Sequence, residues 1–399
     1  MWRCGVILNL SQQAGRWSGA LAQLGIVFCV LMAVQGCSHF KPKPVYPTVY
    51  VVSKQGFLRD RVAAVSNRTA MVGNGDKLLV LDRGRKFLKV QTAKGEVGWI
   101  DDKAVATEQV YGLFDALKAE HKNDPDVASA VVRDEVFLHA KPGRDTERFF
   151  LLQEGVKLKM LQRATLPKAV PGSKGTRAVA PVVAKVLKPG EVAAPLAPSA
   201  MEDWWLVRDA QGRTGWIFSR MIEVDAPDAL TRYAEGQRIV GAYVLTTVHD
   251  EEAETENKDI PVYVTVMSPY KAGLTYDFDQ VRVFTWSLKK HRYETGFRDK
   301  NIEGYLPLTI TSAKDPYGKS PAAQTPAPTF AYKVLAAEAP EVVPDPVTGA
   351  VVPGKTVTKT YRLEGNLVRR VSQPGMPNPM EAHPVVVVKK AVVKGKKKR

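Results

Sequence analysis

Residues 87–100, FLKVQTAKGEVGWI, share one pattern with residues 204–217, WWLVRDAQGRTGWI. Each stretch begins with alternating apolar and polar residues, passes through a turn that contains glycine, and ends in Gly-Trp-Ile. Alternation is typical of a half-buried strand, and glycine suits the positive φ of a hairpin turn. Gly98 and Gly215 stand directly before the Trp, where a missing side chain lets two backbones approach closely. The pattern therefore predicts two β-hairpins, each of which brings a large Trp ring to the core of a small barrel.

The similarity continues upstream of both hairpins. Residues 75–81, GDKLLVL, match residues 155–161, GVKLKML, and residues 58–61, LRDR, match residues 138–141, LHAK, at the same offset. Short matches that recur in one order indicate an internal repeat.

These recurring motifs resemble the bacterial SH3-like domain family known as SH3 type 3. The resemblance covers residues 48–106 and residues 130–225. It implies two small SH3-like barrels that bind peptides or the cell wall, an inference from family likeness that names no site residue.

The N-terminal residues indicate export and lipid attachment. Residues 24–34 form an apolar run that is too short to span a bilayer comfortably. The following Val-Gln-Gly-Cys sequence resembles the lipobox of bacterial lipoproteins, which implies that residues 1–36 are a signal peptide and that Cys37 carries the lipid. Residues 37–47 would then form a tether, and Ser38 resembles the residue of lipoproteins sorted to the outer membrane, facing the periplasm. An ordinary signal peptide or a short membrane anchor is the alternative.

The rest of the chain is expected to be mostly β. Thr107 is a plausible N-cap for a linker helix within residues 107–129. A Pro-rich insertion at residues 164–202 interrupts the second barrel and is expected to be disordered. Residues 229–371 show strand patterns without a recognised fold and predict a third β-rich domain. Residues 372–399 are expected to be a basic disordered tail. The predicted fold class is all-β.

The sequence lacks the usual signatures of catalysis. Its three cysteines, Cys4, Cys29 and Cys37, lie in the first tenth of the chain, and no His-Glu-x-x-His or Gly-x-Ser-x-Gly motif occurs. We therefore expect no enzyme, no catalytic residue and no cofactor. Asp277 and Asp279 share one strand face and are weak candidates for binding a metal such as Ca²⁺.

Four tryptophans are weak candidates for ligand binding, because aromatic faces suit sugars and extended peptides: Trp99, Trp204, Trp205 and Trp216. Trp99 and Trp216 are expected in the barrel cores. Trp204 and Trp205 are adjacent and must point to opposite faces of a strand. One of these two rings is therefore expected at the surface or beneath the insertion.

The net charge of +16 points to anionic partners, and seven basic residues stand among the last eleven. This tail suits an anionic polymer or lipid. Nucleic acid is not expected as a partner, because no nucleic-acid-binding motif is present.

The sequence thus predicts a membrane-anchored envelope lipoprotein that acts as a non-catalytic binding or scaffold module and contacts peptidoglycan or an envelope protein. Two alternatives remain. The chain could be an assembly lipoprotein that binds only proteins, or an enzyme whose site combines Asp277, Asp279, Arg292 and Glu294.

Overall fold

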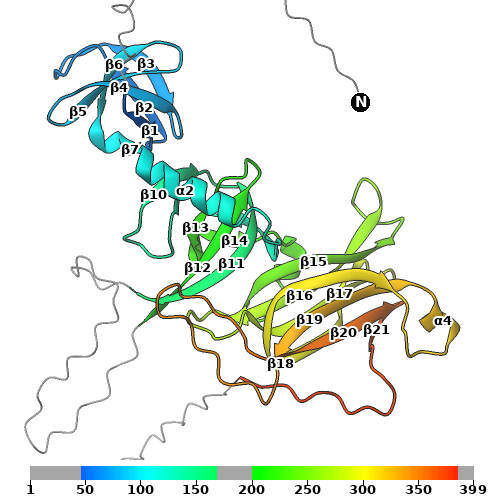
Figure 1. Cartoon of the computed structure of the whole chain (residues 1–399). Helices are drawn as coiled ribbons and strands as arrows, with labels where there is room; N and C mark the ends of the chain where they lie inside the picture. The colour runs from blue at the N-terminus through cyan, green and yellow to red at the C-terminus, as the bar shows by residue number, and fades with distance from the viewer. Residues whose placement is uncertain (1–45, 169–199, 385–399) are drawn as a thin grey trace, which may run out of the picture. The chain divides into compact units, whose positions relative to one another are not determined.

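The structure is a computed structural model that describes residues 46–168 and 200–384. These residues form three seven-stranded antiparallel sheets (Figure 1), which confirms the predicted all-β class. The longest helix among them is α2 (Glu108–Glu120). In this part of the chain no helix has the length and apolar character needed to cross a membrane.

The first sheet has the strand order β3-β2-β6-β5-β4-β1-β7. Leu58, Leu78 and Val90 lie in the single apolar core that this sheet encloses. The strands are β1 (Thr48–Val51), β2 (Gln55–Arg59), β3 (Arg68–Gly73), β4 (Lys77–Arg83), β5 (Phe87–Gln91), β6 (Val97–Asp101) and β7 (Val105–Thr107).

The second sheet repeats this arrangement strand for strand, in the order β10-β9-β13-β12-β11-β8-β14. A 3-10 turn precedes the last strand in both sheets, at Asp102–Ala104 and Ser219–Met221. The predicted internal repeat is therefore confirmed in the topology. The strands are β8 (Ala128–Val132), β9 (Val136–His139), β10 (Arg148–Leu152), β11 (Lys157–Pro167), β12 (Met201–Asp209), β13 (Thr214–Phe218) and β14 (Ile222–Val224).

The glycines of the repeated hairpin have the two roles expected of them. Gly95 and Gly212 turn the chain with φ values of 86° and 75°. A Cβ on Gly98 would lie 2.7 Å from the Leu58 Cβ, and one on Gly215 would lie 2.7 Å from the Leu138 Cβ. Both contacts are too short for real carbon atoms, so each hairpin requires a glycine before its Trp.

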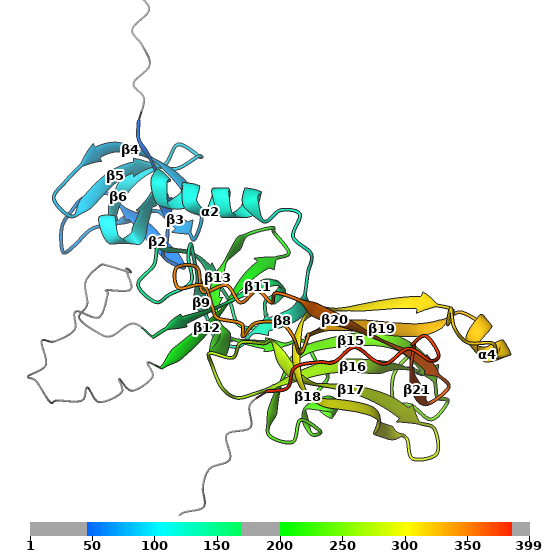
Figure 2. The ribbon, with the colours of Figure 1, turned by 60° about the horizontal axis from the view of Figure 1, so that its bottom comes forward.

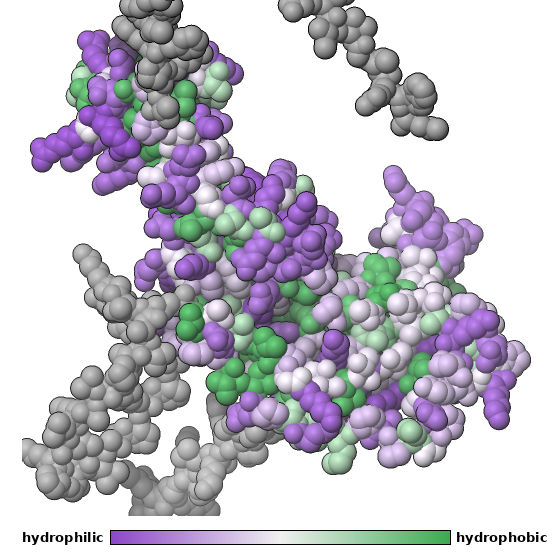
Figure 3. Space-filling model, viewed as in Figure 1, coloured by the Kyte–Doolittle hydropathy of each residue, from purple (hydrophilic) through white to green (hydrophobic). Residues whose placement is uncertain are grey.

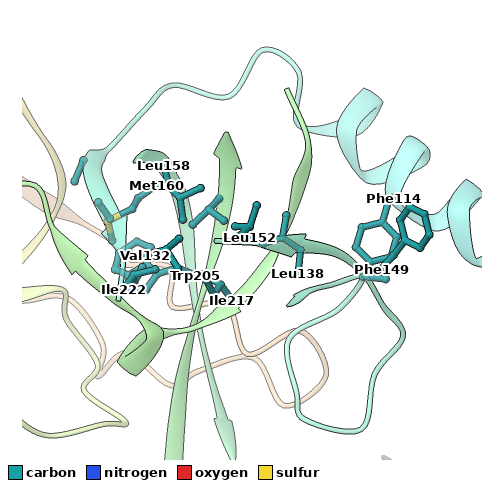
Figure 4. Close-up of a cluster of buried hydrophobic side chains, with 14 of the residues drawn as sticks. Phe114, Val132, Leu138, Phe149, Leu152, Leu158, Met160, Trp205, Ile217 and Ile222 are labelled. Carbon is teal, nitrogen blue, oxygen red and sulfur yellow. The ribbon is translucent and has the colours of Figure 1, made fainter. Parts of the chain in front are cut away.

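Helix α2 joins the two repeats. The Thr107 hydroxyl accepts a hydrogen bond from the Val110 amide, as the predicted N-cap requires. The Tyr111 ring stacks on Tyr50 of the first repeat with centroids 4.0 Å apart. One turn further, Phe114 packs against Phe149 of the second repeat (Figure 4). The helix therefore packs into the core of the second repeat, and Tyr50 of the first repeat joins that same core.

An asparagine side chain makes a second connection between the repeats. The Asn74 amide donates to the Phe149 carbonyl at 2.9 Å, and its oxygen accepts from the Leu151 amide at 3.0 Å. The Asn74 side chain thus pairs with β10 in the way that a neighbouring strand would.

The ends of the predicted disordered insertion are ordered strands. Strands β11 and β12 remain in register from Ala164↔Trp204 to Pro167↔Met201, so the boundaries of 164–202 are wrong at both ends. Ala164 is fully buried, and the Thr165 amide donates to the Gly349 carbonyl of the third domain. The strands extend because these residues gain apolar and backbone partners from that domain. Residues 169–199 lie outside the described residues.

The third sheet is a simple meander, β15 to β21 in sequence order (Figure 2). Val281 and Val283 face one apolar cluster and Phe284 and Trp286 face another, as alternation predicts. The 22-residue strand β18 replaces two shorter strands expected from the sequence. The elements are β15 (Gln237–His249), β16 (Asp259–Pro269), β17 (Phe278–Ser287), β18 (Arg292–Ala313), β19 (Ala327–Leu335), β20 (Thr356–Glu364) and β21 (Leu367–Arg370), with short helices α3 (Asp228–Thr231) and α4 (Pro321–Gln324).

The first part of the predicted disordered tail packs on the third sheet. Glu381 pairs with Lys359 at 2.9 Å, and Lys359 also contacts Asp299 at 2.5 Å. The Lys359 side chain is only 4% exposed, so its charge needs these carboxylates. Residues 380–383 therefore pack on the folded domain, and the prediction that disorder runs unbroken from residue 372 is wrong. Residues 385–399 lie outside the described residues.

The close approach at Gly98 leads to a stability prediction. We expect Gly98→Ala to lower the free energy of unfolding of the full chain by about 1–3 kcal/mol, because the added methyl overpacks the hairpin. Urea unfolding followed by tryptophan fluorescence measures this change.

Gly112→Ala is the matched control. Gly112 lies in α2 with no atom near its would-be Cβ, so we expect an unchanged or slightly raised stability. Equal stability of the two variants would contradict the packing account.

Candidate functional site

The tryptophans of the two Gly-Trp-Ile motifs lie outside the main cores. Ile100 and Ile217 fill those cores, and alternation turns the preceding Trp99 and Trp216 to the opposite face of each sheet. The prediction of a core position is therefore wrong for Trp99, whereas Trp216 is buried in a smaller apolar cluster on the other face. Trp99 remains half-buried, whereas Trp216 is only 8% exposed.

Trp204 and Trp205 point to opposite faces, but neither ring is at the surface. Trp205 lies in the main core of the second repeat (Figure 4). Trp204 joins Trp216 in a smaller cluster on the other face, where Leu117 of α2 and Phe218 cover them. The prediction of one surface ring is wrong because helix α2 and neighbouring apolar side chains bury this second face.

The equivalent face of the first repeat is open and forms a groove. Arg59 pairs across the strands with Trp99, as His139 pairs with Trp216 in the second repeat. Phe87 occupies the position that matches Trp204. A cavity of about 490 Å³ lies over these three positions and is also lined by Phe57, Arg61, Asp101 and the apolar residues Val62, Ala63 and Ala64. We call it the Trp99 groove.

The Trp99 groove combines aromatic faces with charge. The Arg68 guanidinium lies 4.0 Å from the centre of the Phe57 ring and covers one of its faces. Val62, in the β2–β3 loop that forms one wall, is 51% exposed. Hydrophilic side chains otherwise cover most of the visible surface of this repeat (Figure 3). Such a groove can stack a sugar ring or an extended peptide on Trp99 and pair its polar groups with Arg59, Arg61 or Asp101.

Both carboxylate oxygens of Asp277 accept hydrogen bonds within the fold. The Arg163 Nε donates to its Oδ1 at 2.8 Å, and the Leu306 amide donates to its Oδ2 at 2.9 Å. The same guanidinium also donates to the carbonyls of Leu274 and Tyr276. This buried network, which we call the Arg163 network, ties β11 of the second repeat to the third domain.

The other members of the proposed enzyme site lie elsewhere. Asp279 accepts a hydrogen bond from Gln237, and burial raises the pKa of its carboxyl. Glu294 pairs in register with Thr285, six residues along β17 from Asp279, which is roughly 20 Å along the strand. Arg292 lies beside Glu294, at 3.8 Å. The four residues form no common pocket, and no three metal-ligating side chains cluster anywhere in the described residues.

His291, in the turn between β17 and β18, contacts acidic residues of the β15–β16 hairpin. His291 contacts Asp250 at 2.8 Å and Glu252 at 3.0 Å, and Asp250 also accepts from the Trp286 indole. The hydrogen bond that His291 donates to the Asp250 carboxylate raises the pKa of His291 above its ordinary value. This pairing stabilises the hairpin at low pH and is lost as the pH rises through the raised pKa.

Sequence reasoning missed a second cavity, of about 590 Å³, between the second repeat and β15. It is lined by Arg220 and Arg238, among others. Arg220 lies in the 3-10 turn before β14 and Arg238 lies in β15, and neither belongs to a motif, so only the fold shows that they line one cavity.

Comparison with known proteins gives weak structural matches. No family model and no curated protein matches the chain. NlpC2 from Trichomonas vaginalis matches at a TM-score of 0.14 and 9% identity, over 48% of this chain and 56% of that one. An NlpC/P60 family protein from Bacillus cereus ATCC 10987 matches at a TM-score of 0.20 and 10% identity, over 62% of this chain and 98% of that one. NlpC1 from Trichomonas vaginalis matches at a TM-score of 0.15 and 8% identity, over 64% of this chain and 89% of that one.

The structural neighbours carry NlpC names or the NlpC/P60 family name, which does not support the prediction that the chain is not an enzyme. That prediction is withdrawn. With TM-scores of 0.20 or less, no residue role is transferred to this chain. Its own thiols are Cys4, Cys29 and Cys37, and all three lie outside the described residues.

The Arg163 network leads to a second stability prediction. Arg163→Ala leaves Asp277 without its cation in a buried setting, so we expect the free energy of unfolding to fall by about 3–5 kcal/mol. Urea unfolding of the full chain measures it.

Arg133→Ala is the control, because Arg133 forms an exposed ion pair with Glu223 at 3.5 Å. Exposed pairs contribute about 0–1 kcal/mol. If Arg163→Ala were as mild as Arg133→Ala, the network would have no structural role.

Proposed function

We propose that this chain is a lipid-anchored protein of the bacterial cell envelope that binds peptidoglycan through the Trp99 groove of its first repeat. Cys37 would carry the lipid, and the anchor would hold the repeats beside the wall on the periplasmic side of the outer membrane. The resemblance of both repeats to SH3-like domains supports a binding role, and the NlpC/P60 neighbours are compatible with the envelope setting.

One observation carries this proposal. Two repeats with the same topology differ at the same face, because the Trp of the second is covered and that of the first is accessible. An accessible aromatic ring beside cationic and anionic side chains suits the alternating sugars and short peptides of the wall. Burial of Trp216 is what packing alone would favour, so the open Trp99 is best explained by a ligand.

An envelope protein is the second candidate partner. The exposed apolar residues Val62 and Val65 of the β2–β3 loop would suit a protein surface as well as a glycan. Sedimentation with purified peptidoglycan separates these two candidates, because a chain that binds only a protein would not sediment with it.

Trp99→Ala tests the groove. We expect the full chain to sediment with purified peptidoglycan and the variant to bind at least tenfold more weakly, because truncation of an aromatic anchor typically costs about 2 kcal/mol. The measurement is the bound fraction across a range of peptidoglycan concentrations.

Leu79→Ala is the control. Leu79 is an exposed apolar residue on β4 that does not line the groove, so the binding curve of this variant should match that of the unsubstituted chain. Failure of the unsubstituted chain to sediment would reject wall binding, and equal curves for all three proteins would reject the groove.

The lipid anchor has its own test. We expect Cys37→Ala to abolish incorporation of labelled palmitate and to move the protein from the membrane to the soluble fraction of cells. Cys29→Ala is the control and should leave both properties intact. Unchanged labelling of Cys37→Ala would contradict attachment at Cys37.

A further inference from the structure

The cavity between the second repeat and β15 has the size and lining of a small-ligand site. Its volume of about 590 Å³ falls within the range of ligand pockets, roughly 300–1,000 Å³. Met160, Trp205 and Ile222 form an apolar wall from the second repeat. Arg238 and Tyr270 face them from the third domain. The Arg163 network lies next to this cavity and fixes the two walls relative to each other.

Arg238 gives the cavity its chemical character. Its Nε is buried and has no hydrogen-bond partner within the described residues. Neither Arg238 nor Arg220 forms an ion pair in that part of the chain. Burial lowers the pKa of the Arg238 guanidinium. The nearby Asp203 carboxylate opposes this shift, and repulsion from Arg163 and Arg220 adds to it. A buried guanidinium donor without an acceptor is costly to a fold, and an incoming anion can supply that acceptor.

Three other charged groups of the lining already have partners. Asp203 accepts hydrogen bonds from the Thr165 hydroxyl at 2.6 Å and from the Gly273 amide at 3.1 Å. Glu223 pairs with Arg133. The cavity is lined by four cationic side chains, Arg133, Arg220, Arg238 and Lys271, and by three carboxylates, Asp203, Glu223 and Asp228. The lining therefore carries a net charge of one positive unit.

We propose that this cavity binds the free carboxylate of a short peptide, with the carboxylate held between Arg238 and Arg220 and the peptide body against Trp205. A single excess positive charge matches a carboxylate better than a dianion, because the nearby acids repel a second negative charge. The planar guanidinium fork matches the two oxygens of a carboxylate. Asp228, at the edge of the cavity, is an acceptor for the N–H groups of the peptide backbone.

This site is separate from the Trp99 groove and goes beyond the proposed function. It lies on the second repeat and the third domain, and it shares no lining residue with the groove. Wall binding through Trp99 can fail while the carboxylate site stands, and the reverse also holds.

The test uses N-acetyl-alanyl-alanine and its C-terminal carboxamide as probes, which differ only in the charge of the terminal group. We expect calorimetric titration of the full chain at low salt to show binding of the acid, and at least tenfold weaker binding of the amide. Arg238→Met should weaken binding of the acid by at least tenfold, since a desolvated charge pair is lost.

Two controls separate binding from folding. Arg238→Met should remain as stable to urea as the unsubstituted chain or become more stable, because it removes an unpaired buried charge. Arg369→Gln, which lies outside the cavity and removes an exposed partner of Glu364, should bind the acid within twofold of the original affinity. Undetectable binding of the acid, equal binding of acid and amide, or equal binding by Arg238→Met would overturn the proposal. Tighter binding of inorganic phosphate than of the acid would overturn the choice of a carboxylate.

Discussion

The buried contact between Arg163 and Asp277 is the constraint on which the arrangement of the second repeat and the third domain depends. A guanidinium with 6% exposure cannot remain in a protein interior unless its donors are satisfied. Here one carboxylate and two backbone carbonyls of the third domain satisfy it. Because Arg163 lies on β11, the contact also explains why β11 and β12 extend past the repeat and reach the loop at Gly349. The same attachment brings β15 against the second repeat and closes the cavity around Arg238.

The two repeats have the same topology but different surroundings, and the surroundings decide what each face can do. In the second repeat, α2 and Phe218 cover the face that carries Trp204 and Trp216. In the first repeat the corresponding face is open, and Trp99 lines a groove. Duplication therefore supplied one unit that keeps an accessible aromatic face and another that uses the same face for packing.

Much of the fold could be predicted from local pattern. The repeat, the hairpin glycines, the Thr107 cap and the strands of the third domain all follow from spacing and turn chemistry. The errors arose wherever a distant segment supplied the partner. Ala164 reads as part of a Pro-rich loop until the third domain pairs with it, and Lys359 needs Glu381 from the expected tail.

The site was less predictable than the fold for the same physical reason. The sequence pattern correctly placed Trp204 and Trp205 on opposite faces, but no local pattern reveals whether a helix covers a face. Asp277 and Asp279 resemble an acid pair in sequence, yet each has a different structural partner, Arg163 and Gln237. Arg238 and Arg220 carry no motif, and their proximity is a product of tertiary structure alone.

Residues from outside the second repeat complete its apolar core. Tyr50 of the first repeat and Leu306 of the third domain pack into the same cluster as Trp205, together with Phe114 of α2. A segment cut at the sequence boundaries of the repeat would expose that apolar surface to water. The second repeat is therefore not an independent folding unit, and we expect it to fold cooperatively with the segments on either side of it.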